Sequence, residues 1–297
     1  MKIGVMYSGI GGRNGADFVA EFLLNALRVM GHAGVPLGTH GGGQVEEVPG
    51  DLDFVICSSG RGLTPKLVDR FRKRTTVVLW THNDELPDWK AIISRISPLV
   101  DIHFSYTKNH GYGDHVLYLP LAADQTVYHP LHSEVDYDFD VAMIGSRRSW
   151  RTRFAEGIKK VYSKAFFHFD MNLSHEEVNS IYNRTRVVLA PVQDCDDEKP
   201  AAAWGCPCRT FDVPASGAFQ IQVNRGGLAD VYPDAVVLDP VEDVVQAVER
   251  WIEEVDFWLA NPGERDRIAR KHHSRTIEDH LYQNRIQTMI DEVLLSR

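Results

Sequence analysis

The stretch from Arg209 to Ile221 carries the most informative side chains of this 297-residue chain. It predicts a short helix that bears the acid Asp212, then a stop at Gly217, then a buried strand. Five residues further on, Gly226-Gly227 opens another turn. A carboxylate can accept hydrogen bonds from ribose hydroxyls, and backbone N–H groups at glycine turns can face phosphate oxygens. This combination indicates a site for a sugar nucleotide.

A cluster of arginines follows another predicted strand, in Gly145-Ser-Arg-Arg-Ser-Trp-Arg151. A glycine turn lets the backbone approach a ligand closely, and guanidinium forks bind phosphate oxygens through two hydrogen bonds. The cluster therefore indicates a diphosphate-binding loop that begins at Gly145. The sequence does not choose among its basic candidates, which are Arg147, Arg148, Arg151 and Arg153.

The loop Ser8-Gly-Ile-Gly-Gly-Arg-Asn-Gly15 links the first predicted strand to the first predicted helix. Its glycines, Gly11 and Gly12 among them, are too irregular for the dinucleotide-binding fingerprint, and the loop lacks the Gly-Lys-Ser/Thr of a P-loop. It is either a ligand-contacting loop or a flexible connection.

General-base candidates stand in Trp80-Thr-His-Asn-Asp-Glu85, directly after a predicted buried strand. Asp84 is the first choice, His82 the second, and Glu85 also qualifies, because each titrates in a useful range when partly desolvated. The alternative is that Asn83-Asp84 only forms a turn.

Two series of alternating strands and helices must position these residues, which is typical of parallel sheets wrapped by helices. We expect a linker between Pro120 and Tyr137, and domains over residues 1–125 and 126–275, followed by a last helical segment over 276–297. The predicted strands are Lys2–Tyr7, Phe54–Ser58, Thr76–Trp80, Ile102–Ser105, His115–Tyr118, Phe139–Ile144, Ala165–Phe169, Arg186–Ala190, Ala218–Gln222 and Ala235–Leu238.

Helix signals complete the second series. Ser174-His-Glu-Glu177 is a capping box that opens a helix. The tail is predicted to be helical from Val241 onward, with breaks near Asn261-Pro-Gly263 and around His273.

Composition places the chain among soluble globular proteins, with 43% hydrophobic and 25% charged residues. It contains no apolar run long enough to span a membrane and no signal-peptide pattern, so we expect a cytoplasmic protein. The net charge of −9 argues against a general affinity for nucleic acid. Cys195, Cys206 and Cys208 do not have zinc-site spacing, so we expect free thiols rather than a metal site.

Two further segments, Tyr118-Leu-Pro-Leu-Ala-Ala-Asp124 and Val141-Ala-Met-Ile-Gly-Ser146, complete a pattern with the stretch around Asp212. From Leu117 to the C-terminus the chain resembles the GT-B glycosyltransferases, especially the CgeB-like (spore maturation) branch of the group 1 transferases. The resemblance implies an α/β protein with two doubly wound Rossmann-like domains facing across a cleft. It also implies an N-terminal acceptor domain, a C-terminal nucleotide-sugar domain, and a last helix, Ile277–Leu295, that packs back on the N-terminal domain.

By this resemblance Asp212 stands where the group 1 transferases have the second Glu of a paired-acid motif, which holds the donor ribose. The first acid of that motif would fall on Trp204, so Glu198 or Asp197 is left as its substitute. Arg209 matches a family arginine and is either a phosphate or carboxylate partner or an ion-pair partner of Asp212. The resemblance also implies that four glycines, two in each domain, lie against the donor phosphates: Gly11, Gly12, Gly226 and Gly227.

The implied function is sugar transfer from a nucleotide-diphosphate sugar, most simply a UDP-sugar, to an acceptor hydroxyl. The family implies no metal, no tightly bound cofactor and retention of configuration. The acceptor is a glycan, a protein, a metabolite or a modified base in DNA; the basic run Arg70–Arg74 is the one hint of the last. The alternatives are a sugar-nucleotide epimerase and a sugar-nucleotide-binding module without catalysis.

Overall fold

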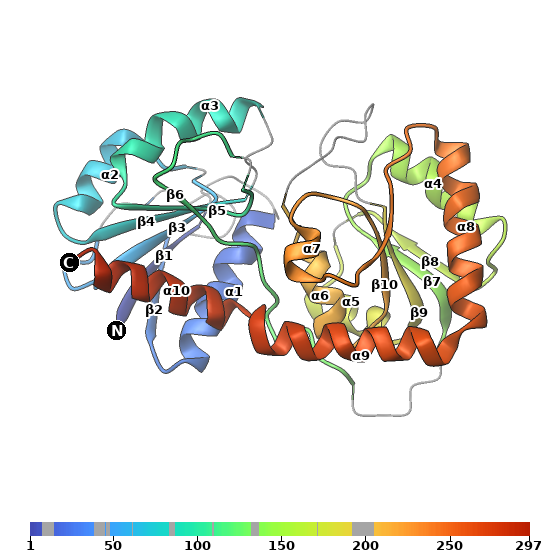
Figure 1. The fold of residues 1–297 in the computed structure, drawn as a ribbon. Coiled ribbons are helices and arrows are strands. Elements are labelled where there is room, and N and C mark those ends of the chain that lie inside the picture. The colour runs from blue at the N-terminus through green and yellow to red at the C-terminus, as the bar shows by residue number, and fades with distance from the viewer. Residues whose placement is uncertain are drawn as a thin grey trace. The chain divides into compact units, whose positions relative to one another are not determined.

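The computed structural model describes residues 1–7, 15–38, 45, 48–60, 62–82, 87–108, 110–131, 137–170, 172–191 and 205–297. The chain forms two compact units (Figure 1). Unit 1 comprises Met1–Leu121 and Leu281–Arg297, and unit 2 comprises Ala122–His280.

Unit 1 is built on a six-stranded parallel sheet with the order β2-β1-β3-β4-β5-β6. The helices α1 and α10 lie on one face of the sheet, and α2 and α3 lie on the other (Figure 1). Its elements are β1 (Lys2–Met6), α1 (Gly15–Val29), β2 (Ala33–Leu37), β3 (Phe54–Ser58), α2 (Pro65–Arg72), β4 (Thr76–Thr81), α3 (Pro87–Ile96), the 3₁₀ turn η1 (Ser97–Leu99), β5 (Ile102–Ser105), β6 (Val116–Tyr118) and α10 (Tyr282–Leu295).

Strand β2 is the one described strand that the sequence pattern did not predict. Its sequence, Ala-Gly-Val-Pro-Leu, contains Gly34 and Pro36, both of which argue against a strand. The strand lies at the edge of the sheet and pairs only with β1. An edge strand tolerates proline because one side of its backbone has no neighbouring strand to bond.

Unit 2 is built on a five-stranded parallel sheet with the order β11-β10-β9-β7-β8. The helices α4 and α8 cover one face, and α5 and α6 cover the other (Figure 1). Its elements are β7 (Phe139–Ile144), α4 (Ser149–Lys159), β8 (Ala165–His168), α5 (His175–Asn183), β9 (Thr185–Ala190), α6 (Arg209–Ala215), β10 (Gln220–Val223), α7 (Leu228–Val231), β11 (Val236–Leu238), α8 (Val244–Ala260) and α9 (Pro262–Asp279).

The cores are apolar and continuous within each unit. In unit 2, Phe154 packs between Trp150 and Trp251, with ring centroids 5.1 and 5.5 Å away. Central strands such as β3 and β9 are buried almost throughout, as expected for strands covered by helices on both faces. None of the described helices is both long and apolar enough to cross a bilayer.

The predicted capping box of α5 is confirmed: the Ser174 hydroxyl accepts from the Glu177 N–H, and the Glu177 carboxylate accepts from the Ser174 N–H. The predicted break around His273 is wrong, because α9 continues through it to Asp279. The chain breaks instead at His280, and the Asn284 side chain then caps α10 by accepting from the Leu281 N–H at 2.8 Å. Ile277 therefore belongs to α9, and the last helix starts at Tyr282.

Candidate functional site

Asp212 is a buried acid on the short helix α6, with 7% of its surface exposed. Oδ1 of its carboxylate has no hydrogen-bond partner among the described residues. Burial raises its pKa well above the usual range; the Arg209 guanidinium opposes this rise, and Asp124 adds to it. A buried acceptor without a donor costs free energy until a ligand or a proton satisfies it. Arg209 therefore acts on Asp212 through charge, without satisfying Oδ1.

Gly145 marks the point where two arginines meet the end of β7. A Cβ atom added at Gly145 would lie 2.8 Å from Nη2 of Arg209 and 3.3 Å from Nη1 of Arg151. Glycine thus lets the two guanidiniums approach the backbone closely, and an alanine would push them aside. Two separate segments of the sequence, the loop from Gly145 to Arg151 and the start of α6 at Arg209, come together at this edge of the sheet.

The structure separates the arginines of the Gly145 loop. Arg151 is buried, and its Nη1 donates to the Ser146 carbonyl oxygen at 3.0 Å and to Oγ at 2.9 Å. Arg147 instead forms an ion pair with Asp170 at 2.7 Å, with 62% of its side chain exposed. Arg148 and Arg153 are exposed as well, and Arg148 caps α4 through its backbone only. Arg151 is the arginine of this loop that lies beside Gly145.

Two tyrosines contact the same cluster and were not predicted from the sequence. The rings of Tyr128 and Tyr182 stack with centroids 6.4 Å apart, and the Tyr128 hydroxyl lies 2.8 Å from Nδ1 of His175. Burial raises the pKa of both hydroxyls; nearby Asp212 raises it further, and Arg209 opposes the rise. Tyr128 follows a segment with no helical or strand period, so nothing local in the sequence pointed to it.

Asp124 is also buried, and the sequence pointed to it only as the last residue of the family-like segment Tyr118–Asp124. Its Oδ1 accepts from the backbone N–H of Thr126 at 2.9 Å and from the Thr126 hydroxyl at 2.7 Å. Asp124 thereby closes the turn that leads to Tyr128, whose N–H donates to the Asp124 carbonyl oxygen.

The turn at Gly226-Gly227 follows β10 on the same sheet edge. Gly227 has φ = +85° and precedes α7, so it needs the left-handed conformation that glycine adopts readily. The carbonyl oxygen of Gly226 accepts from the N–H of Gly205 at 3.0 Å. Arg225, with 8% exposure, stands directly before this turn and is a further buried arginine that the sequence pattern did not single out.

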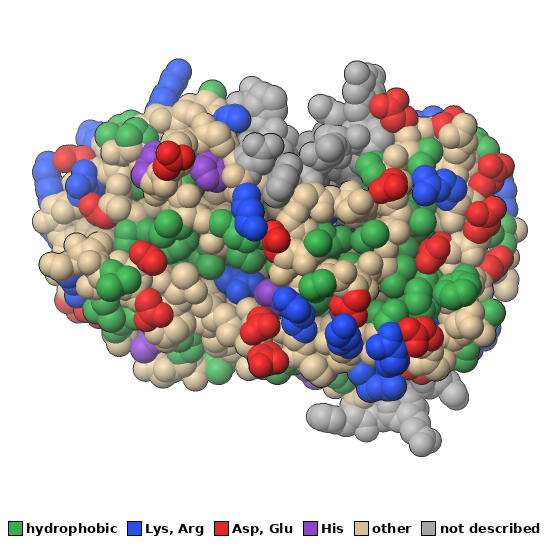
Figure 2. Space-filling view, viewed as in Figure 1, with side chains coloured by type: hydrophobic (Ala, Val, Ile, Leu, Met, Phe, Trp, Pro, Cys, Tyr) green, Lys and Arg blue, Asp and Glu red, His purple; other side chains and the backbone are tan. Residues whose placement is uncertain are grey.

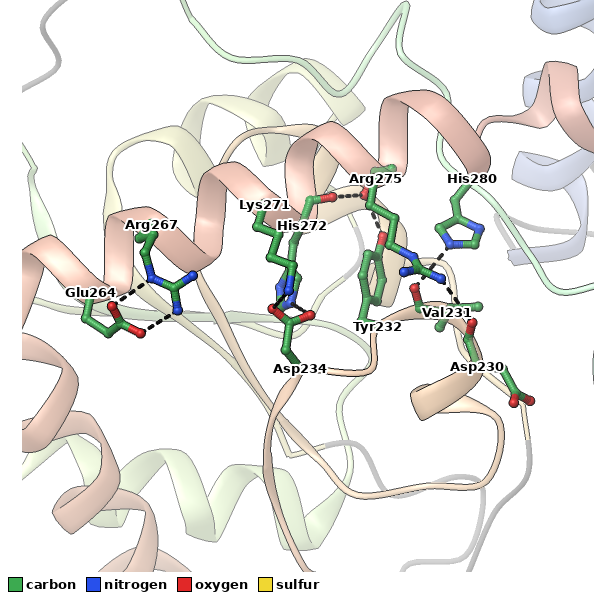
Figure 3. A network of polar contacts seen from close by, with 11 residues as sticks. Asp230, Val231, Tyr232, Asp234, Glu264, Arg267, Lys271, His272, Arg275 and His280 are labelled. Carbon is green, nitrogen blue, oxygen red and sulfur yellow. Dashed lines mark hydrogen bonds and ion pairs between the residues drawn. The ribbon is translucent and has the colours of Figure 1, made fainter.

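Helix α9 holds α7, and with it the preceding Gly226-Gly227 turn, in place (Figure 3). Lys271 pairs with Asp234 at 2.8 Å, and the Tyr232 hydroxyl lies 2.5 Å from Oγ1 of Thr276. His280, just after α9, lies with Nε2 3.3 Å from the Val231 carbonyl oxygen. These contacts tether the Gly226-Gly227 turn through the short helix that follows it.

In unit 1, His82 follows β4 and is buried. Its Nε2 lies 3.0 Å from Oγ of Ser58, at the end of the neighbouring strand β3. The next residue, Ser59, has φ = +68°, a strained conformation that is common at functional sites. Asp84, Glu85, Gly11, Gly12, Asp197, Glu198 and Trp204 lie outside the described residues.

The described residues include no group of acids, cysteines or histidines arranged to hold a metal ion. Burial raises the pKa of the Cys206 thiol to about 12, so this thiol stays protonated at neutral pH. The basic run Arg70–Arg74, at the C-terminal end of α2 and just after it, is largely occupied. Arg72 pairs with Asp101, Lys73 pairs with Asp69, and Arg74 donates to the Val48 carbonyl oxygen.

Comparisons with known proteins agree with this architecture. A family model described as glycosyl transferase-like matches residues 125–291, more than half of the chain. Among curated proteins, no sequence matches significantly.

Solved structures match over nearly the whole chain. An alpha-glucosyltransferase in complex with UDP and a 13-mer DNA has a TM-score of 0.72 at 11% identity, covering 99% of both chains. HepE from Anabaena, in complex with UDP and glucose, has a TM-score of 0.64 at 10% identity and full coverage of both chains, 100% each. AviGT4, a glycosyltransferase involved in avilamycin A biosynthesis, has 0.59 at 16% identity, covering 94% of this chain and 95% of its own. The predicted fold class is confirmed. The chain belongs to the glycosyl transferase-like family and is a glycosyltransferase of the GT-B fold.

Proposed function

We propose that this glycosyltransferase moves a sugar from a UDP-sugar to an acceptor hydroxyl, and that unit 2 binds the nucleotide. The observation that supports this most is the unsatisfied Oδ1 of Asp212 beside Arg209, with Arg209 and Arg151 meeting at Gly145. The carboxylate can accept from ribose hydroxyls, and the two guanidiniums can bind the oxygens of the diphosphate. UDP is the nucleotide in two of the similar structures, the alpha-glucosyltransferase and HepE.

In this proposal the ribose hydroxyls donate to Asp212. The hydrogen bond supplies the donor that Oδ1 lacks. Burial raises the pKa of Asp212, and the charge of Arg209 opposes this rise; the ribose donors act in the same direction as Arg209 and favour the ionised carboxylate. Removing a hydrogen bond to a charged group costs about 1.5–3 kcal/mol. Binding the nucleotide thus offsets a cost that the protein already carries in its unbound state.

The diphosphate then lies against Gly145, Arg151 and Arg209, with the backbone of Gly226-Gly227 as a further contact. Fixed guanidiniums and backbone N–H groups stabilise the charge that develops on a leaving diphosphate. Such a site has no need of a divalent cation, so we propose metal-independent transfer.

Chelation tests this last point. We expect turnover to persist after dialysis against EDTA, because protein groups carry the positive charge. Activity that is abolished by EDTA and restored by Mg²⁺ or Mn²⁺ would show that a metal shares this role.

The stereochemical part of the proposal is retention, as in most group 1 relatives, with the donor phosphate taking the acceptor proton. In an inverting enzyme a base in unit 1 must take that proton, and Asp84 and then His82 are the candidates. The hydrogen bond between the Ser58 hydroxyl and Nε2 of His82 would set the orientation of the imidazole ring. Proton NMR of the first-formed product, from a donor of known configuration, separates the two outcomes. An inverted product from a fully active Asp84→Asn enzyme would contradict both the proposed retention and the choice of Asp84 as the base.

Calorimetry with UDP tests nucleotide binding directly. We expect Asp212→Ala to weaken binding by about 1–3 kcal/mol, because a charge-assisted hydrogen bond is lost. Asp291→Ala, which removes an acid from helix α10 in unit 1, is the control and should bind UDP like the wild type. Wild-type affinity in a folded Asp212→Ala protein would remove Asp212 from the site.

A hydroxyl on a modified DNA base is the second acceptor that an observation favours, because the alpha-glucosyltransferase of similar fold was crystallised with DNA containing an HMU base. Against it, the protein carries a net charge of −9, and the basic residues of the run Arg70–Arg74 are mostly paired within the protein. A transfer assay with hydroxymethylated and unmodified duplexes distinguishes this acceptor from glycans and small metabolites.

A further inference from the structure

Unit 2 contains a cavity of about 280 Å³ at the amino ends of its strands. Tyr137 precedes β7, Thr185 begins β9, and Phe219 precedes β10, and all three line it. Gly145 and Arg225 stand at the opposite ends, after β7 and β10. A strand rises about 3.3 Å per residue, so the six residues of β7 separate the two edges by roughly 20 Å. The cavity is therefore distinct from the candidate nucleotide site.

Among the described residues, three arginines line this cavity, together with one carboxylate, that of Asp266. Arg265 is 4% exposed, and Oδ1 of Asp266 accepts from both its Nε, at 3.3 Å, and its Nη2, at 3.2 Å. Arg186 pairs with Asp140, which lies outside the cavity lining. The guanidiniums of Arg186 and Arg265 lie 5.5 and 5.6 Å from the ring centroid of Tyr137. The described lining of the cavity thus carries more positive than negative charge.

Arg270 is the exposed member of the three and has no ion pair or hydrogen bond through its side chain within the described part of the chain. Other basic side chains gather on the surface over α9 (Figure 2), but the neighbouring Arg267 is engaged by Glu264 at 2.6 Å. Arg270 is thus available to an anion in the cavity. Guanidinium forks suit phosphate oxygens, and burial strengthens the interaction.

The hydroxyl groups of the lining point to the rest of the ligand. The Thr185 hydroxyl donates to the Ile181 carbonyl oxygen at 2.6 Å, and the Ser216 hydroxyl donates to the Asp212 carbonyl oxygen at 2.9 Å. With their protons used, both oxygens are left as acceptors. Acceptors suit a ligand that carries hydroxyl groups. The volume is several times the roughly 30 Å³ that one water molecule takes in the liquid, enough for a small organic molecule.

We propose that this cavity is a second ligand site, specific for a small sugar phosphate. Arg265 and Arg270 bind the phosphate group, and Thr185 and Ser216 accept from sugar hydroxyls. The proposal does not depend on the identity of the donor nucleotide.

Calorimetry on the full chain with glucose 6-phosphate, at constant ionic strength and with or without saturating UDP, tests the proposal. We expect binding in both conditions, tighter than binding of inorganic phosphate. Arg270→Gln should raise the Kd about tenfold, as expected when a hydrogen bond to a charged group is lost. Arg267→Gln, on the same helix but outside the cavity, should leave the Kd unchanged. Arg270 is exposed, so its substitution leaves the fold intact.

Three results would overturn the proposal. The first is the absence of glucose 6-phosphate binding to the wild-type protein, or binding no tighter than that of inorganic phosphate. The second is displacement of glucose 6-phosphate by UDP, which would show that it binds at the nucleotide site and not in this cavity. The third is an equal loss in the Arg270→Gln and Arg267→Gln proteins, which would reduce the effect to surface charge. If UDP itself fails to bind, the measurement without UDP still decides the question, so the two proposals fail separately.

Discussion

At the scale of single residues, the protein keeps an acid in a place that is unfavourable for stability. Asp212 is buried, its Oδ1 lacks a hydrogen-bond donor among the described residues, and burial raises its pKa well above the usual range. Natural proteins tolerate such buried, unsatisfied groups mainly where function requires them. Replacing such a group can therefore improve stability and impair activity at once.

The raised pKa of Asp212 leads to a pH-dependent prediction. The folded protein holds this proton more tightly than the unfolded chain does. The free energy of unfolding contributed by Asp212 is therefore fully present below its unfolded pKa and is lost as the pH rises towards the folded pKa. We expect Asp212→Asn to remove that loss and to raise the stability of the unliganded protein at neutral pH relative to wild type.

Urea unfolding at acidic and neutral pH, without ligand, measures this effect. The stability difference between Asp212→Asn and wild type should grow as the pH rises. A difference that stays constant with pH would mean that Asp212 has an ordinary pKa in the folded protein.

Gly145 allows a second test at this scale. A Cβ atom there would meet the ends of Arg209 and Arg151, which are flexible and can move aside. We expect Gly145→Ala to change the free energy of unfolding by less than about 1 kcal/mol. Because both guanidiniums shift, UDP affinity should fall about tenfold, which corresponds to about 1.4 kcal/mol.

Gly263→Ala is the matched control for Gly145→Ala. An added Cβ at Gly263 meets no atom within 4 Å, and the residue lies in the first turn of α9. This substitution should stabilise the protein by about 0.5–1 kcal/mol and leave UDP affinity unchanged. Equal UDP affinity in both variants would show that Gly145 is not near the nucleotide.

At the scale of elements, helices far along the chain hold the short segments that carry the site. Helix α6 has seven residues and no side-chain cap at its N-terminus. Nδ1 of His273 on α9 lies 2.9 Å from the Pro214 carbonyl oxygen, close to the C-terminal end of α6. Short helices have little stability of their own, so α6 depends on such tertiary contacts.

Helix α10, at the end of the chain, is bound to unit 1 by buried side chains. The Arg285 guanidinium is buried and donates to the carbonyl oxygens of Pro120 and Leu121, at 2.8 and 3.0 Å. Tyr282 packs on Phe22 and Trp80 with ring centroids 5.5 and 6.1 Å away. The segment that leaves unit 1 is therefore bonded to the helix that returns to it.

We expect Arg285→Ala to lower the free energy of unfolding by about 1.5–3 kcal/mol, because buried carbonyl groups lose a charged donor. Gln287→Ala, on the exposed face of α10, should cost less than about 0.5 kcal/mol. Chemical denaturation of both variants decides the point. Equal free energies of unfolding for the two variants would mean that the buried hydrogen bonds of Arg285 contribute no more to stability than an exposed side chain of α10.

At the scale of the whole molecule, the described candidates for nucleotide binding all belong to unit 2. Gly145, Arg151, Arg209, Asp212 and Gly227 lie within Ala122–His280, and α10 does not. A ligand that binds the native state stabilises the region it contacts against local opening.

Hydrogen exchange measured with and without UDP should therefore show slower exchange in residues 145–151, 209–216 and 226–231. Exchange in α10 should change much less. Protection that is strongest in unit 1 would contradict the assignment of the nucleotide to unit 2.

The local sequence was sufficient for most elements of both sheets. Central strands such as Phe54–Ser58 and Phe139–Ile144 were predicted with the bounds that the structure shows, because strands covered on both faces need continuous apolar runs. The capping box at Ser174 was predictable for a different reason, because both of its hydrogen bonds join residues three apart in the sequence. Strand β2 was not, because its pairing with β1 outweighs the poor propensity of Gly34 and Pro36.

The types of the site residues were visible in the sequence, and their grouping was decided by the tertiary structure. An acid on a short helix and a glycine–arginine loop are local patterns. Which arginine lies beside Gly145 depends on where α4 and α6 direct their side chains, and this selects Arg151 and Arg209 while leaving Arg147 with Asp170. Tyr128 and Tyr182 are far apart along the chain, and their rings stack because the fold of unit 2 buries both side chains in one place. Such contacts carry no periodic signal, so only the folded chain defines them.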